Sequence, residues 1–189
     1  MTSVAVSHVK GGVGKTTFTY GLALELAARG RTVELVDRDR NNTSLSKLAD
    51  ASGLPRHVWL RNGVVHAADV RLFDCPPAID DVNVGAISEA DVLVVPAIPE
   101  RLVMDVLVDM LAMVDQVKRL NPTLRVALVP NLVRQQWPAH AAFIDSMAVL
   151  ADEHGLVLLD PVPSRQSIML GDWRGRPLRH VADWIERAS

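Results

Sequence analysis

Short, almost continuously apolar runs alternate along the chain with longer segments in which apolar residues recur every three or four positions. Runs of the first kind predict strands covered on both faces, as in a parallel sheet. They occupy residues 3–9, 32–37, 69–74, 91–98, 125–130 and 155–160. Segments of the second kind predict helices at about 16–29, 80–88, 100–120, 136–153 and 177–187.

This alternation predicts an α/β fold with one domain over residues 1–189. We expect a single doubly wound, mostly parallel sheet with helices on both faces. Sheets of this kind bind ligands at the carboxyl ends of their strands. The stretch 51–68 has no clear period, and we assign no element to it.

The segment 100–120 is apolar nearly all round. A helix of that kind is either buried within its own domain or shared with a partner. The pattern slightly favours an interface. The apolar positions are Leu102, Val103, Met104, Val106, Leu107, Met110, Leu111, Met113 and Val114.

Composition narrows the class of protein. The formal net charge of −2 gives the whole chain no general attraction for nucleic acid or membranes, so a local basic face would have to supply it. The single cysteine, Cys75, excludes an intrachain disulfide and a metal cluster built from cysteine alone. No apolar run approaches the roughly 20 residues of a membrane-spanning helix, and no signal peptide is visible. We expect a cytoplasmic protein.

Candidate chemistry begins with "HVKGGVGKTT", residues 8–17, which lies between the first predicted strand and the first predicted helix. That context is the one in which a glycine-rich loop cradles phosphate with its backbone N–H groups. Gly11, Gly12 and Gly14 permit the close backbone approach. Lys15 is positioned to neutralise β- and γ-phosphate charge, and the Thr16 hydroxyl to complete a Mg²⁺ shell.

The common phosphate-loop pattern requires glycine five positions before Gly14, where this chain has Val9, and an extra lysine, Lys10, follows. "KGGVGKTT" resembles the deviant Walker A motif of the ParA/MinD class of P-loop ATPases. The resemblance implies that Lys10 contacts phosphates bound by the other subunit of an ATP-dependent homodimer, and that ATP and Mg²⁺ are the cofactors. The nucleotide-binding residues that it implies in this loop are Gly11, Gly12, Val13, Gly14, Lys15, Thr16 and Thr17.

Two aspartates follow the second predicted strand in "VELVDRDRN" (33–41). Asp39 matches the family's switch aspartate, which positions the attacking water and responds to the γ-phosphate, and Asp37 matches the aspartate before it. The family's usual Pro-Gln is replaced here by Arg40 and Asn41, which leaves the hydrolysis rate open. The alternative is that both carboxylates only cap a strand end, since Asp is common in turns.

"VRLFDCPP" (70–77) resembles the family's Walker B strand and its switch turn. The resemblance assigns Asp74 to Mg²⁺, which it would hold through water. Cys75 is expected to be a small buried residue rather than a nucleophile.

"ALVPNLV" (127–133) matches the strand end whose asparagine reads adenine in this family. Asn131 is therefore the base-recognition candidate, because its amide offers both a donor and an acceptor; a turn-forming role is the alternative. "DPVPSRQS" (160–167) resembles the late loop that flanks the base, and this implies a contact by Pro163.

Among the branches of this class, the resemblance favours the short ParA-like partition proteins. These are slow, partner-stimulated ATPases that bind DNA without sequence preference as ATP dimers, which implies a ParB-like or centromere-binding partner and a place on the nucleoid. The candidate DNA contacts are Arg165, Arg174, Arg176 and Arg179, and a merely solvated basic surface is the alternative.

Two other functions stay open, a MinD-like membrane-associated regulator and a metabolic P-loop enzyme. The last helix, 177–187, places Leu178, Val181 and Ile185 on one face but carries mixed charges. We therefore expect it to pack on the core, with no stable membrane association.

Overall fold

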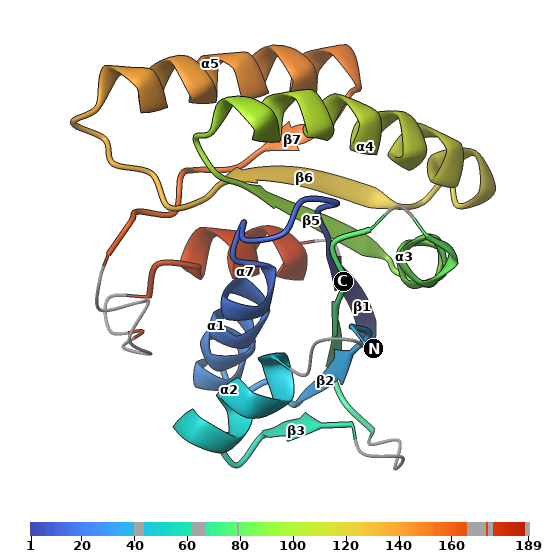
Figure 1. Cartoon of the computed structure of the whole chain (residues 1–189). Coiled ribbons are helices and arrows are strands. Elements are labelled where there is room, and N and C mark those ends of the chain that lie inside the picture. The colour runs from blue at the N-terminus through green and yellow to red at the C-terminus, as the bar shows by residue number, and fades with distance from the viewer. Residues whose placement is uncertain (40–43, 62–66, 79, 166–172, 174–175, 188–189) are drawn as a thin grey trace.

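The computed structural model describes residues 1–39, 44–61, 67–78, 80–165, 173 and 176–187 (Figure 1). Seven strands form one sheet in the order β3-β2-β4-β1-β5-β6-β7, and every neighbouring pair is parallel. The strands are β1 (Thr2–Val6), β2 (Val33–Asp37), β3 (Val58–Leu60), β4 (Val70–Asp74), β5 (Val92–Ala97), β6 (Arg125–Pro130) and β7 (Val157–Leu158). The helices are α1 (Lys15–Ala28), α2 (Ser44–Ser52), α3 (Asp81–Ser88), α4 (Arg101–Leu120), α5 (Pro138–Glu153) and α7 (Arg179–Glu186). The predicted α/β class is confirmed.

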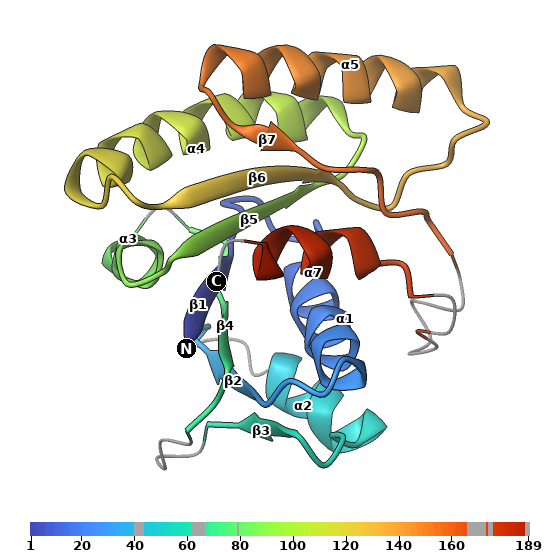
Figure 2. The same cartoon turned by 180° about the vertical axis from the view of Figure 1, so that it is seen from behind.

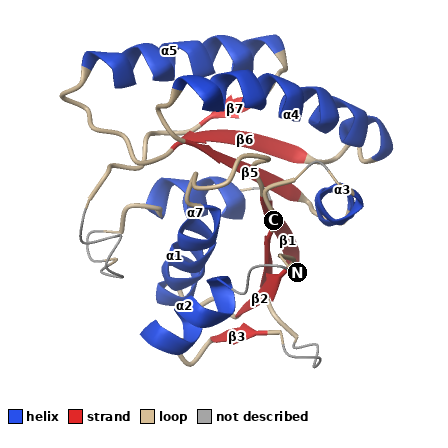
Figure 3. Ribbon diagram, in the orientation of Figure 1, coloured by secondary structure: helices blue, strands red, loops and turns tan. Residues whose placement is uncertain are grey.

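Helices cover both faces of the sheet, with α1, α2 and α7 on one side and α3, α4 and α5 on the other (Figures 2 and 3). Successive side chains of a strand point to opposite faces, so each apolar strand supplies both layers. In β1, Val4 and Val6 pack with α1 and α7, whereas Ala5 packs with the α3–α4 layer. This double burial explains why the strands read as nearly continuous apolar runs.

The chain order places a ligand crevice beside β1. From β1 the chain runs outward through α1 to β2, and from β5 it runs outward in the opposite direction through α4 to β6. The strand order therefore reverses between β1 and β5, which is where open parallel sheets bind ligands.

Sequence patterning missed two elements, helix α2 and strand β3. Strand β3 lies at the edge of the sheet, in the unassigned stretch 51–68, and α2 begins before that stretch. With only three residues, β3 is too short to show an alternation, and α2 buries only Leu45 and Ala49.

Helix α4 is amphipathic, so the prediction that it is apolar nearly all round is wrong. Seven residues, from Val103 to Val117, are buried against the sheet and its neighbours. Polar side chains such as Asp105 and Asp109 occupy the outer side, interrupted by exposed Leu102 and Val108. Its apolar stripe is thus satisfied within the domain and does not require a partner.

Helix α7 packs on the core, as predicted. Leu178, Val181 and Ile185 are almost fully buried. The Arg29 side chain ties α7 to the end of α1 through Asp183 (2.7 Å) and Glu186 (2.8 Å). In the part of the chain that the structure describes, no helix is both long and apolar enough to cross a membrane.

Candidate functional site

The glycine-rich loop connects β1 to α1 and forms the floor of a cavity of about 400 Å³. Gly12 and Gly14 have φ of 81° and 87°, in the left-handed region where any other residue would be strained. A Cβ on Gly14 would also lie 3.0 Å from Asn131 Nδ2. The cavity is lined by Gly11, Gly12, Gly14, Lys15, Thr16, Thr17, Asp39, Ser44, Leu48, Cys75 and Pro77. Helix α1 begins at Lys15, so its N-terminal N–H groups open at this cavity, as in anion sites.

Lys15 is buried, and its Nζ donates to the carbonyl oxygen of Lys10 (3.1 Å). Burial lowers the pKa of the Lys15 ammonium, while the nearby Asp74 acts in the opposite direction. An ammonium group in this position gains strongly from a bound anion, because few other charges compensate its burial. The structure therefore places Lys15 where the sequence predicted it.

Lys10 lies at the rim, and it is not among the residues that line the cavity. Its Nζ forms an ion pair with Glu100, the residue that precedes α4. Both side chains are partly exposed. The two lysines of the loop are thus separated in the single chain, with one facing the cavity and one facing α4.

His8 has a role that the sequence analysis did not assign. Its side chain is fully buried, and Nδ1 accepts the backbone N–H of Lys10 (3.0 Å). Burial, followed by the charges of Lys15 and Lys10, lowers the pKa of His8 to about 4. The imidazole is therefore neutral at physiological pH, which lets it accept this hydrogen bond and fix the loop at Lys10.

Two carboxylates meet at the ends of neighbouring strands. Asp37 ends β2 and Asp74 ends β4, and the two are paired in the sheet register. Burial raises the pKa of Asp74 to about 7, and the charge of Asp37 adds to the shift. Thr16 hydrogen-bonds to the Asp74 carboxylate, and Thr19 Oγ1 lies 3.4 Å from its Oδ1. A cation at this position would relieve the cost of placing the buried Asp74 carboxylate beside the half-buried Asp37.

This donor set fits Mg²⁺. Asp37 Oδ2 is buried without a hydrogen-bond partner among the described atoms, and hydroxyl and carboxylate oxygens are the ligands that hard cations prefer. Within the described ranges, no three His, Cys, Asp or Glu side chains are grouped as in a fully protein-ligated metal centre. Mg²⁺ does not require such a group, because it usually takes one or two carboxylates together with waters and phosphate oxygens.

Asp39 follows the end of β2 and lines the phosphate cavity. Its backbone N–H donates to Asp37 Oδ1 (3.0 Å), so the two aspartates form one turn. Arg40 and Asn41, which replace the family's Pro-Gln, lie outside the described residues. Cys75 also lines the cavity, but burial raises the pKa of its thiol to about 12, in keeping with a non-nucleophilic role.

A second cavity, of about 180 Å³, adjoins the first and shares Gly12, Gly14 and Thr17 with it. Asn131 lines this cavity, and its Nδ2 donates to the carbonyl oxygen of Val13 (2.9 Å). The asparagine therefore also braces the glycine-rich loop. The remaining lining comes from Phe18, Leu132, Val162, Trp173 and Leu178, which the sequence analysis did not assign to the site.

The late loop lies beside this cavity. Pro163 pairs with Val133 in an isolated bridge, and the lining contact comes from the preceding Val162. Leu132 has φ of 55°, a strained value for a residue with a side chain. The glycine-rich loop, the asparagine and the late loop were recognisable as motifs, whereas the apolar lining residues leave no signal distinct from core residues.

Two of the four candidate DNA-contact arginines, Arg176 and Arg179, line the same open cavity. Arg165 and Arg179 are exposed, and Arg174 lies outside the described residues. Arg176 is engaged by Glu25 through two hydrogen bonds, of 2.9 and 2.6 Å. Its guanidinium is therefore committed to α1.

Residues 4–178 match the family described as the CobQ/CobB/MinD/ParA nucleotide binding domain. The chain is 27% identical to the maintenance of carboxysome distribution protein A of Halothiobacillus neapolitanus over 179 residues, which cover 88% of this chain and 81% of that protein. It is 27% identical to the chromosome-partitioning ATPase Soj of Thermus thermophilus over 163 residues, covering 65% and 66% of the two chains. The apo structure of McdA from Cyanothece superposes with a TM-score of 0.79 at 17% identity, covering 100% of this chain and 99% of that one. With the glycine-rich loop, the paired carboxylates and the parallel sheet in the expected places, the chain belongs to the ParA/MinD-type family of P-loop nucleotide-binding ATPases.

Proposed function

We propose that this protein is a small ParA-type ATPase that closes into a homodimer over ATP and Mg²⁺ and then binds DNA without sequence preference. In this role it would partition DNA cargo such as a plasmid or chromosome. The observation that carries the proposal is the separation of the two loop lysines, since Lys15 faces the phosphate cavity and Lys10 lies at the rim. A rim lysine is placed to serve a neighbouring subunit's phosphates rather than its own.

The chain's own groups divide the work of ATP hydrolysis. The glycine-rich loop and Lys15 would hold the β- and γ-phosphates in cis. Thr16 and Asp74 would hold Mg²⁺, which would supply charge neutralisation at the phosphates. Asp39 lines the same cavity and orients the attacking water. Lys10 of the second subunit then stabilises charge that develops on the γ-phosphate, as an arginine finger does.

The ion pair between Lys10 and Glu100 must open for Lys10 to act in trans. Both side chains are partly exposed, so solvent screens the pair and it costs little to break. ATP in the opposite subunit offers a more highly charged partner. Nucleotide binding and dimerisation are thereby coupled through one side chain.

DNA binding in the dimer would rest on exposed arginines, of which Arg165 and Arg179 are the described candidates. Two relatives act in chromosome partitioning and carboxysome distribution by their names, which supports a positioning role. We place the protein on the nucleoid, with slow hydrolysis stimulated by a ParB-like or centromere-binding partner that releases the dimer.

The test is binding to random-sequence duplex DNA at one fixed moderate salt concentration, with no nucleotide, ADP or ATP. Binding that appears only with ATP, and is lost in both Lys15→Ala and Lys10→Ala, is the expected result. Removing Arg165 or Arg179 should reduce the slope of log affinity against log salt by about one each if it contacts one phosphate. ATP hydrolysis without DNA binding in any state would contradict the proposal and favour a membrane regulator or a small-molecule enzyme.

A further inference from the structure

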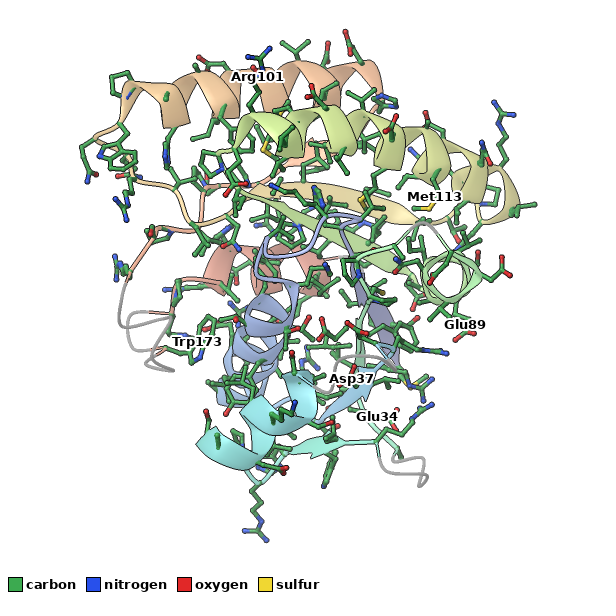
Figure 4. The ribbon with its side chains drawn as sticks, viewed as in Figure 1. Glu34, Asp37, Glu89, Arg101, Met113 and Trp173 are labelled. Carbon is green, nitrogen blue, oxygen red and sulfur yellow. The ribbon has the colours of Figure 1, made fainter. Side chains whose placement is uncertain are left out.

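Trp173 lies beside α1 (Figure 4). Its ring occupies the space that a side chain at Gly21 would take, since a Cβ built there would overlap the ring carbons Cε3, Cζ3 and Cη2. The ring therefore packs directly on the helix backbone. Gly21 lies about 1.7 turns after Lys15, the first residue of α1.

Trp173 is linked to the same helix through Arg176. Arg176 N donates to the Trp173 carbonyl oxygen (3.2 Å). The Arg176 guanidinium donates two hydrogen bonds to the carboxylate of Glu25, which lies one helical turn beyond Gly21. Two contacts on one face of α1 thus fix the position of the indole.

Trp173 also lies at the 180 Å³ cavity that adjoins the phosphate site. Trp173 lines that cavity together with Asn131 and Phe18. The indole N–H is buried and has no hydrogen-bond partner among the described residues. A buried donor without a hydrogen-bond partner costs free energy.

We propose that Trp173 is an affinity-determining residue for the nucleotide base, and that it forms the aromatic wall of the base pocket opposite Asn131. This assignment rests on the proposed ATP-binding function. A purine has flat apolar faces and a polar edge, and an indole offers a matching flat surface and one N–H donor. Gly12 and Gly14 line both cavities, so a nucleotide with its phosphates in the first cavity can place its base in the second.

Gly21 then has a functional role although it touches no ligand. Any side chain there displaces the indole from α1 and opens the wall of the base pocket. Alanine has a higher helix propensity than glycine, so Gly21→Ala should not destabilise α1 on that account.

The experiment compares the affinity for ATP with that for inorganic tripolyphosphate, which carries the phosphates without a base. Trp173→Ala should weaken ATP binding on the order of tenfold, because stacking on an aromatic side chain contributes about 1–3 kcal/mol per base. Its affinity for tripolyphosphate should stay unchanged. Gly21→Ala should reproduce both results, and the double variant should be no worse than either single one.

Gly85→Ala is the matched control, because Gly85 is also helical and a Cβ there meets nothing within 4 Å. Trp173→Phe should bind ATP more weakly than wild type and more tightly than Trp173→Ala, since it keeps a ring but loses the N–H. The ATP-induced change in tryptophan fluorescence should disappear in Trp173→Phe.

Wild-type affinity for ATP in both Trp173→Ala and Gly21→Ala would overturn the assignment, as would equal losses for ATP and tripolyphosphate. If Trp173→Ala fails to fold, Gly21→Ala and the fluorescence of Trp173→Phe still decide the question. If the wild type binds tripolyphosphate but not ATP, the base pocket is wrong while the phosphate site stands. If it binds neither, the proposed function itself fails and this assignment falls with it.

Discussion

Replacing Asp74 by asparagine should make the free protein more stable while destroying its response to Mg²⁺ and ATP. Asp74 is 2% exposed and lies beside a second carboxylate, Asp37. Burial raises its pKa from 3.8 to about 7. At 1.36 kcal/mol per pH unit this shift corresponds to roughly 4 kcal/mol, the cost of keeping the carboxylate ionised in the fold.

Asparagine has nearly the same shape and carries no charge, but it loses the attraction to Lys15. We therefore expect a net gain of about 2 kcal/mol at pH 8, which for a chain of this size raises the melting temperature by about 4–8 °C. The gain depends on pH in a defined direction. The folded wild type keeps the Asp74 proton up to about pH 7, whereas the unfolded chain loses it near pH 4. The contribution of Asp74 to wild-type stability therefore decreases as the pH rises from 4 to 7. The stability advantage of Asp74→Asn is accordingly largest at pH 8 and becomes smaller as the pH is lowered towards 4.

The assay is thermal and urea denaturation at pH 4.5 and pH 8, first with a metal chelator and then with Mg²⁺ and ATP. Ligand at 100 times its dissociation constant stabilises the wild type by about 2.7 kcal/mol, a gain that Asp74→Asn should not share. The order of stabilities should thus reverse on addition of the cofactors. Asp145→Asn, on the exposed side of α5, should change nothing at either pH. An Asp74→Asn protein that is no more stable than wild type at pH 8 with chelator would refute the account of Asp74 as an electrostatic cost retained for a cation.

Other substitutions test separate parts of the structure. Lys15→Ala should abolish nucleotide binding in a calorimetric titration. Lys10→Ala should bind ATP normally but remain monomeric with ATP in size-exclusion chromatography. An ATP-dependent Lys10→Ala dimer would exclude the trans role of Lys10. Asp39→Ala should bind ATP and release phosphate at least tenfold more slowly in a steady-state assay, and an unchanged rate would assign the water to another group. Arg29→Met should lower the free energy of unfolding, measured by urea denaturation, by about 2 kcal/mol, because it leaves buried Glu25 with one fewer partner. Arg31→Met, at the exposed edge, should have no measurable effect. Equal effects of the two variants would contradict the anchoring of α7 by Arg29.

Patterning predicted the order of most elements because parallel strands and the helices that cover them carry strong local periods. The failures have local causes. Strand β3 owes its place to pairing with β2 rather than to its own three residues, and α2 buries too little apolar surface to show a clear face. The character of α4 was misjudged because exposed Leu102 and Val108 interrupt its polar side.

The sequence by itself determined the phosphate site, because the glycines, Lys15 and Thr16 are neighbours in the chain and their spacing alone builds the loop. Only the tertiary structure decided what surrounds that loop. The sheet register sets Asp37 beside Asp74, α4 brings Glu100 to Lys10, and the late segment lays Trp173 on Gly21. The residues in these contacts are far apart in the sequence and are of common types. No local periodicity or spacing therefore predicts that they meet. Their meeting depends on the packing of whole elements, which is why the charge state of the cation site and the wall of the base pocket emerged only with the fold.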